Sequence, residues 1–384
     1  MLFQLSEEQD FLIQSLRKFC QQEIAPLAEK VDQEKLFPHQ NFSKMAQLGL
    51  LGLSIPEEQG GSGGDSFYYL AMIEEVARAC ASTSVIVAVH TGLACTSLSS
   101  FGTTEQQARY LPAMVEGEKI GAYALTEEQA GSDAASLQLQ ARLEGDHYIL
   151  RGSKIFITNA SQAQVIITFA RAPGTTGADG IHCFIVEAPT KGLEVSKPLP
   201  KMGLHGSETC QLYFDDVKVP KENVLGSPGE GFKIAMALLD GGRLAIAAQA
   251  LGIAQAAFDY TLSYLQQRHQ FGRPLSANQG IQWMIADMAT ELDAARLLLY
   301  RAASLKESGL PFSKEASMAK KYSTDQAMKI TTDCLQLLGG YGYSQEYPLE
   351  RHMRDVKATQ IYEGTNQIQR IVIARQLLRE ASRK

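Results

Sequence analysis

Leu137-Gln-Leu-Gln-Ala-Arg-Leu-Glu-Gly-Asp-His-Tyr-Ile-Leu150 is the stretch in which the hydrophobic pattern of the chain changes its period. Its first half alternates apolar with polar side chains, the apolar ones being Leu137, Leu139, Ala141 and Leu143. A period of two is typical of a β-strand that buries one face. Glu144-Gly145-Asp146 is a turn signal, and Tyr148 and Leu150 continue the pattern beyond it. We therefore expect two strands joined by a turn.

The β pattern extends outward from this turn over about residues 119–228. Ile155 and Ile157 prolong the second strand, and further strands are predicted at residues 165–169, 182–186 and 211–214. This part of the chain is expected to form a middle, barrel-like antiparallel β domain of six or seven strands.

The segments on both sides of the β region have helical periodicity. In residues 1–118 the helical pattern begins near Leu5, where Ser6 and Gln9 fit a capping box ahead of an apolar stripe. In residues 229–384 long amphipathic stretches cover 245–265, 279–305 and 313–338, and a last helix is expected to run from Thr365 to the end. The predicted class is a multidomain α+β protein with an N-terminal helical domain, a middle β domain and a C-terminal helical bundle.

Composition excludes several classes of function. The 384-residue chain has a net charge of -6, which disfavours nucleic acid and an anionic membrane surface as partners. The longest apolar stretch, residues 85–98, is shorter than the roughly 18 residues of a membrane span. The six cysteines form no C-x-x-C pair and the histidines are scattered, so no metal site is predicted. The N-terminus resembles no signal or transit peptide, and we expect a cytoplasmic, bacterial protein.

Two glycine-rich stretches do not have the pattern of a nucleotide-binding loop. Gly60 to Gly64 lacks the lysine and hydroxyl of a P-loop, and Gly339-Gly340-Tyr341-Gly342 lacks Rossmann spacing and a surrounding βαβ unit. Both are predicted to be loops between helices, so any dinucleotide must bind without a Rossmann fold.

Near the C-terminus, Ala358-Thr-Gln-Ile-Tyr-Glu-Gly-Thr-Asn-Gln-Ile-Gln369 resembles the C-terminal signature of the acyl-CoA dehydrogenase family. The resemblance covers nearly the whole chain and is closest to the short-chain, butyryl-CoA branch. It includes TEEQAGSD at 126–133, GSKIFITN at 152–159, KMGLHGS at 201–207, DGGR at 240–243, RHQFG at 268–272 and QLLGGYG at 336–342. The motifs occur in the family's order and spacing, and the implied three-domain fold agrees with the α, β, α order.

The resemblance implies that Glu363 is the catalytic base. A carboxylate in a dry pocket becomes more basic because burial disfavours its charge. Without the motif, Glu363 would be interpreted as a solvated glutamate near a helix start. In the family, the base removes the substrate α-proton and flavin N5 takes the β-hydride, which gives the trans-2-enoyl thioester. The Glu363 N–H and a ribityl hydroxyl hydrogen-bond the thioester carbonyl, and electrons pass to electron-transferring flavoprotein.

The resemblance also implies FAD as cofactor, held partly across a subunit interface in a homotetramer that is a dimer of dimers. Residues at the flavin ring would be Tyr123, Ala124, Leu125, Thr126, Gly131, Ser132, Phe156, Ile157 and Thr158. The remainder of the cofactor would be held by Arg268, Phe271, Gln279, Gln336, Leu337, Gly339, Gly340, Thr365, Asn366 and Gln367. Family members often carry Trp where this chain has Phe156.

For the acyl-CoA substrate, the residues that match family positions are Ser132, Asp240, Arg243, Tyr362 and Gly364. Asp240 and Arg243 are spaced i, i+3, so a structural ion pair is an open alternative. Some family members carry the catalytic glutamate at the position that corresponds to residue 242. This chain has a glycine there and its glutamate at 363. Residues 82–87 contain no arginine for a second carboxylate, so a neutral, short acyl group, straight or branched, is expected.

Other functions stay open for this sequence. The same residues would serve another thioester, such as an acyl group on a carrier protein, or an enoyl-CoA reduced in the reverse direction. A non-catalytic acyl-CoA-binding relative or a structural helical bundle is disfavoured because Glu363 and the flavin motifs are all in place.

Overall fold

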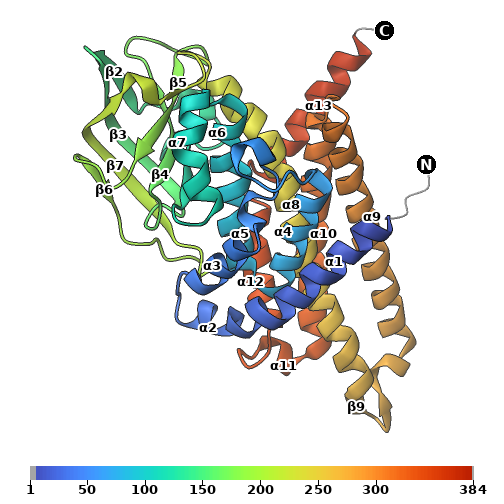
Figure 1. Cartoon of the computed structure of the whole chain (residues 1–384). Coiled ribbons are helices and arrows are strands. Elements are labelled where there is room, and N and C mark those ends of the chain that lie inside the picture. The colour runs from blue at the N-terminus through green and yellow to red at the C-terminus, as the bar shows by residue number, and fades with distance from the viewer. Residues whose placement is uncertain (1–5, 383–384) are drawn as a thin grey trace.

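The computed structural model describes residues 6–382, so Leu5 and the last two residues lie outside the described part of the chain. The N-terminal part is helical, as predicted (Figure 1). The Ser6–Gln9 capping box is confirmed, because Gln9 N donates to Ser6 Oγ over 3.1 Å and Ser6 N donates to Gln9 Oε1 over 3.0 Å. The α-helices are α1 (Glu7–Phe19), α2 (Ala28–Gln33), α3 (His39–Gln47), α4 (Ser66–Ala79), α5 (Ala81–Val87), α6 (Thr96–Phe101) and α7 (Thr104–Val115).

The middle part is an eight-stranded sheet with the order β6-β7-β3-β2-β4-β5-β8 and with β1 paired to β4. The predicted turn at residues 144–146 joins β2 and β3, which pair antiparallel with Ala141 opposite Leu150. The strands are β1 (Gly121–Ala124), β2 (Gln140–Glu144), β3 (His147–Thr158), β4 (Val165–Arg171), β5 (Ile181–Glu187), β6 (Leu193–Val195), β7 (Thr209–Pro220) and β8 (Val224–Leu225).

Two features of this sheet differ from the sequence expectation. It has eight strands rather than six or seven, because β6 and β8 span only three and two residues and are too short to show a period. The strand β1 also runs parallel to β4, so the sheet is mixed rather than purely antiparallel. The direction of pairing depends on how the chain returns to the sheet, which alternation within a strand does not encode.

The C-terminal part is a bundle around the long helix α8 (Gly231–Gln267). Gly252 of α8 packs tightly on α4, since a β-carbon there would lie 2.1 Å from the carbonyl oxygen of Glu74. The predicted stop at Gly339 is confirmed, with φ of 60°. The other elements are β9 (His269–Gln270), β10 (Arg273–Pro274), α9 (Gln279–Glu307), α10 (Ser313–Leu338), α11 (Gly340–Tyr343), α12 (Leu349–Thr359) and α13 (Asn366–Ala381).

Two helical runs of the described chain, 81–101 and Gly231–Gln267, are long and apolar enough to cross a membrane by length and composition alone. In each, 72% of the most apolar window is buried inside the protein. Packing in the hydrophobic core accounts for their composition.

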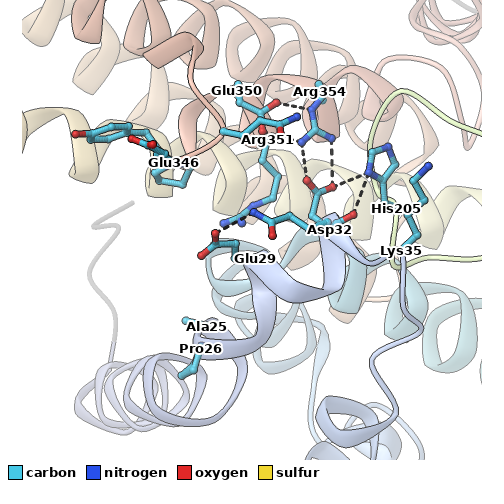
Figure 2. A pocket seen from close by; sticks show the side chains of 14 residues that line it. Ala25, Pro26, Glu29, Asp32, Lys35, His205, Glu346, Glu350, Arg351 and Arg354 are labelled. Atoms are coloured by element: carbon cyan, nitrogen blue, oxygen red, sulfur yellow. Dashed lines mark hydrogen bonds and ion pairs between the residues drawn. The ribbon is translucent and has the colours of Figure 1, made fainter. Parts of the chain in front are cut away.

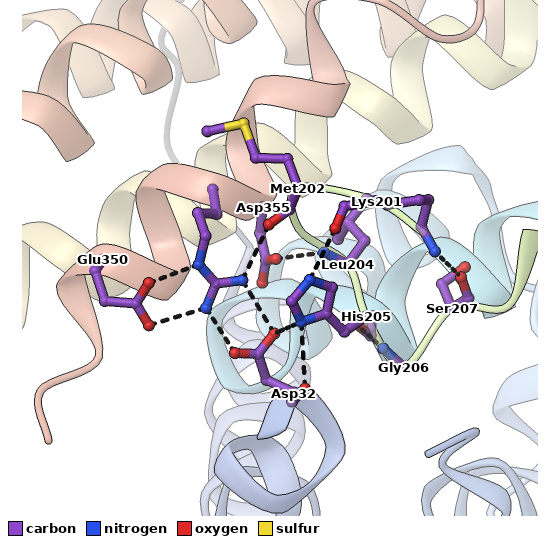
Figure 3. A network of polar contacts seen from close by, with 11 residues as sticks. Asp32, Lys201, Met202, Leu204, His205, Gly206, Ser207, Glu350 and Asp355 are labelled. Carbon is purple, nitrogen blue, oxygen red and sulfur yellow. Dashed lines mark hydrogen bonds and ion pairs between the residues drawn. The ribbon is translucent and has the colours of Figure 1, made fainter. Parts of the chain in front are cut away.

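The three domains meet at a charged junction of α2, α12 and the 201–207 loop. Arg354 Nη2 lies 2.6 Å from Asp32 Oδ2, and Arg354 Nε lies 2.6 Å from Glu350 Oε2. A cavity of about 810 Å³ opens beside them (Figure 2). His205 Nδ1 lies 2.9 Å from Asp32 Oδ1, and Leu204 N donates to Asp355 Oδ1 over 2.5 Å (Figure 3). These contacts join the N-terminal, middle and C-terminal parts of the chain at one place.

Candidate active site

A second cavity, of about 630 Å³, lies between the β domain, α8 and α13. It brings together residues from five distant segments of the chain. The β domain contributes the two predicted flavin motifs, and α8 contributes an apolar wall. The lining residues include Leu93, Tyr123, Leu125, Thr126, Ser132, Phe156, Ile157, Thr158, Met236, Leu239, Arg243, Tyr362, Glu363, Gly364 and Ile371.

Glu363 enters this cavity from the loop between α12 and α13. Its backbone is left-handed, with φ of 53°, which is strained for a residue with a side chain. Gln369 Nε2 holds the turn by donating to the carbonyls of Glu363 and Gly364, over 3.2 and 2.8 Å. On the preceding residue, the Tyr362 hydroxyl donates to Gln249 Oε1. These bonds hold the turn in a conformation that directs the carboxylate inward.

The Glu363 carboxylate is shielded and incompletely paired. Its Oε2 atom is buried and has no hydrogen-bond partner among the described residues. Burial raises the pKa of Glu363 to about 7, while the positive charges of Arg243 and Lys320 act to lower it. A carboxyl with a pKa near neutrality, and with a free oxygen facing a cavity, can accept a proton from a weak carbon acid.

Gly242 of α8 makes room for this carboxylate. A β-carbon at position 242 would lie 2.7 Å from Glu363 Oε2 and 3.4 Å from Leu93 Cδ2. The position at which some family members are expected to carry their base is therefore adjacent to the carboxylate that this chain supplies from residue 363.

The structure places most of the predicted flavin-ring residues on the cavity wall. Phe156 is 63% exposed and left-handed, with φ of 59°, so its ring is not part of the sheet core. Thr126 and Thr158 add hydroxyl groups to the same wall. Ala124 is an exception, because its side chain is fully buried in the sheet core and only its backbone can take part. An aromatic face with nearby hydroxyl and amide groups fits a planar, polar-edged ring such as a flavin.

The residues predicted for the rest of the cofactor do not reach this cavity within one chain. Arg268 lies over the Tyr341 ring at 5.5 Å, and the Phe271 side chain is fully exposed. Both lie at the β9 end of the bundle, whereas α13 lies at the opposite end (Figure 1). Gln279 begins α9, and the predicted residues at the end of α10 are Gln336, Leu337, Gly339 and Gly340. One chain therefore presents two separate halves of the predicted FAD site.

The three predicted residues beside the base have different surroundings. Thr365 caps α13, where its hydroxyl accepts from Ile368 N over 3.4 Å. Asn366 is buried, and its amide donates to Thr324 Oγ1 and Asp325 Oδ1 over 2.8 and 2.7 Å. Gln367 is exposed. The buried Asn366 side chain fastens the loop to α10.

Of the predicted substrate residues, Asp240 is the one that lies outside the cavity. It accepts from Arg243 Nη1 over 2.5 Å and from Ser313 Oγ over 2.9 Å. The ion pair left open by the sequence is thus present, and it holds a buried arginine whose Nε has no partner among the described residues. Ser132, Arg243, Tyr362 and Gly364 all line the cavity.

Sequence reasoning missed Lys320, which is fully buried and close to the base loop. A lysine between Ala316, Ala319 and Ser323 on the apolar face of α10 was the available signal, because an unpaired buried ammonium is costly. No group of His, Cys, Asp and Glu residues able to hold a metal ion occurs among residues 6–382.

Comparison with known proteins places this architecture in one family. Models of the N-terminal, middle and C-terminal domains of acyl-CoA dehydrogenase match residues 6–118, 122–217 and 229–378. A short-chain specific acyl-CoA dehydrogenase of Clostridium acetobutylicum is 46% identical, over 99% of this chain and 100% of its own. An acryloyl-CoA reductase (NADH) of Anaerotignum propionicum is 44% identical, over 99% of this chain and 96% of its own.

Solved structures agree with this placement. Butyryl-CoA dehydrogenase from Megasphaera elsdenii has a TM-score of 0.96 at 44% identity, covering 98% of this chain and 100% of that chain. A chain in a structure described as the electron transferring flavoprotein of Acidaminococcus fermentans has a TM-score of 0.97 at 46% identity, covering 99% of this chain and 100% of that chain. The protein belongs to the acyl-CoA dehydrogenase family, whose members are FAD flavoproteins.

Proposed function

We propose that this enzyme catalyses FAD-dependent α,β-dehydrogenation of a short, straight or branched acyl-CoA to the trans-2-enoyl-CoA. The observation that carries the proposal is the unpaired, shielded Oε2 of Glu363 in a cavity shared with both flavin motifs. Glu363 removes the α-proton, and its own charge is neutralised in the same step. A dry site favours that change because burial destabilises the charged form.

The α-proton becomes acidic enough only if the thioester carbonyl is polarised. The backbone N–H of Glu363 donates to no acceptor among the described residues, so it is available to that oxygen. Glu363 would then supply the base with its side chain and stabilise the developing enolate with its backbone N–H. The flavin, when bound against Thr126, Phe156 and Thr158, supplies the hydride acceptor.

The proposed partners follow from separate features. The two half-sites for FAD at opposite ends of the chain support a homo-oligomer, a tetramer as in the family. The chain of the Acidaminococcus structure supports electron-transferring flavoprotein as the acceptor. Residues 82–87 carry no charged group, and all six are buried, which supports a neutral acyl tail. The cytoplasmic location stays a prediction.

A second candidate is reduction of an enoyl-CoA with the same residues. It is favoured by the 44% identity to the acryloyl-CoA reductase over nearly the whole chain. Proton transfer from protonated Glu363 to Cα is the microscopic reverse of the first proposal, so the geometry serves both directions. A thioester on a carrier protein is a third substrate class.

Anaerobic titration of the purified yellow protein tests the proposal. Butyryl-, isobutyryl-, 2-methylbutyryl- and octanoyl-CoA are compared on wild type and Glu363→Gln. Bleaching of the flavin band by a short thioester, with loss of bleaching in the variant, supports the proposal. If the flavin is bound and none of the four bleaches it, the substrate assignment is wrong, and crotonyl-CoA oxidation of the dithionite-reduced enzyme tests the reverse direction.

A further inference from the structure

Lys320 of α10 is a buried ammonium beside the catalytic loop. Its side chain is fully shielded from solvent. The Nζ atom donates to the carbonyl oxygen of Gly364 over 2.8 Å and to Asn366 Oδ1 over 3.0 Å. Both acceptors lie within three residues of Glu363. Lys320 therefore binds the same Glu363–Gly364 turn to which Gln369 of α13 donates. The strained φ of Glu363 needs such support from outside the turn.

The charge on Lys320 has no hydrogen-bonded carboxylate among the described residues. Its two acceptors are a backbone carbonyl and a side-chain amide, both neutral. The nearby Asp325 lies 3.3 Å from each of two other cations, Lys321 Nζ and Arg370 Nη2. Glu363 is the acid whose charge acts most strongly on this ammonium, and Asp325 has a smaller effect. Burial lowers the pKa of Lys320 to about 7, and Glu363 opposes that shift.

The other charged and titratable groups around Glu363 cannot replace Lys320. Arg243 of α8 also favours the ionised form of Glu363, but it already forms an ion pair with Asp240. The remaining groups coupled to Glu363 are phenols, Tyr69 of α4, Tyr123 of β1 and Tyr362, whose pKa values burial raises, so they are neutral. Of the two cations that act on the Glu363 carboxylate, Lys320 is therefore the one without an ion-pair partner among the described residues.

We propose that Lys320 is the positioning residue of the catalytic base: it anchors the Glu363–Gly364 turn to α10 and favours the ionised carboxylate before substrate binds. This inference rests on the proposed function, because it assigns a partner to the base of that reaction. Lys320 does not line the cavity, so its effect is exerted through Glu363.

Two variants separate the effect of the Lys320 hydrogen bonds from the effect of its positive charge. Lys320→Met removes both the donor and the charge, whereas Lys320→Gln keeps an amide donor and removes only the charge. Lys329→Met is the matched control, because Lys329 lies on the same helix and is exposed. Flavin content and circular dichroism check that each variant is folded, and rapid-mixing bleaching by the best thioester is measured from pH 5.5 to 9.5.

In Lys320→Met we expect the bleaching rate at pH 7 to fall by roughly tenfold or more, with its apparent pKa moved upward by about one unit. The dissociation constant of the thioester should change much less. In Lys320→Gln we expect the same upward move but a higher limiting rate at alkaline pH. Lys329→Met should behave as wild type.

Three results would overturn the inference. One is a Lys320→Met profile with an unchanged apparent pKa and a rate within about twofold of wild type. Another is a bleaching rate that falls by the same factor at every pH in both Lys320→Met and Lys320→Gln. A third is failure of both variants to fold, which would make Lys320 a structural residue only. If wild type itself is not bleached by any thioester, the proposed function fails first, which is a distinct outcome.

Discussion

A β-carbon on Gly242 would lie 2.7 Å from the Oε2 of Glu363, closer than two non-bonded atoms approach. The position of the carboxylate that we propose as the base therefore depends on the absence of a side chain at residue 242 of α8. By resemblance, position 242 is where some family members are expected to carry their base, and the contact shows that the two positions are neighbours in this fold.

The first prediction is that Gly242→Ala impairs the base without unfolding the protein. The added methyl must displace the Glu363 carboxylate, because α8 is buried and rigid at that point. We expect the bleaching rate to fall by roughly 10²-fold, since small misplacements of a catalytic group have effects of that size. Gly241→Ala is the control, because nothing lies within 4 Å of a β-carbon at that position. Equal loss in both variants would show that the helix, not the carboxylate contact, is responsible.

The second prediction concerns pH and activity. With a pKa of about 7, Glu363 is protonated and inactive as a base below neutrality. The rate of flavin bleaching should therefore rise between about pH 6 and pH 8 and then level off. Stopped-flow measurements across this range test it, and a rate independent of pH from 5.5 to 8 would contradict the shifted carboxyl.

The third prediction is that Glu363→Gln stabilises the folded protein at alkaline pH. Burial raises the folded-state pKa of this acid above its ordinary value of 4.5, so ionisation opposes folding once the pH exceeds that value. The penalty grows until the pH passes about 7 and is then on the order of 3 kcal/mol. Thermal unfolding should show a higher midpoint for Glu363→Gln than for wild type at pH 8, with little difference at pH 4.5. A lower midpoint at pH 8 would contradict the account.

The fourth prediction concerns the ion pair beneath the flavin motifs. Lys154 Nζ lies 2.8 Å from Glu127 Oε1 and 2.9 Å from the carbonyl of Leu125, and both charged side chains are almost fully buried. Breaking such a pair leaves an uncompensated charge and costs about 3–5 kcal/mol. Lys154→Met should therefore lower the unfolding midpoint and release flavin.

Arg142 and Glu144 form the matched control for that pair. Their contact is 2.5 Å, but the two side chains are 63% and 49% exposed. Arg142→Met is expected to cost less than about 1 kcal/mol. If Arg142→Met and Lys154→Met have equal effects, burial is not what makes the inner pair important.

The fifth prediction follows from the separation of the two half-sites. Arg268→Ala should weaken FAD retention even though Arg268 lies at the far end of the chain from Phe156. Flavin released on dialysis measures this, and sedimentation checks that the oligomer is intact. Full retention of FAD would show that the exposed Arg268–Phe271 segment has another role.

The sequence predicts the architecture well where local patterns decide it. The turn between β2 and β3, the bounds of α10 and the cap at Thr365 all follow from period, caps and glycines. The parallel pairing of β1 and β4 does not, because it depends on the path of the chain between distant strands.

Glu363, Tyr362 and Arg243 were identified for the site by resemblance, and the structure brings them together in one cavity. Lys320 was not identified, since a motif names the residues that touch ligands and not those that hold them. The i, i+3 spacing of Asp240 and Arg243 is compatible with a substrate contact and with an ion pair. The ion pair is seen only in the three-dimensional structure.

The most direct test of the central claim isolates proton removal from electron transfer. An acyl-CoA analogue with sulfur in place of the β-carbon cannot lose a hydride, so exchange of its α-protons in D₂O reports the base alone. By NMR, wild type should catalyse this exchange, and Glu363→Gln should slow it by roughly 10³-fold or more. Equal exchange in the two proteins would show that another group removes the α-proton and that Glu363 is not the base.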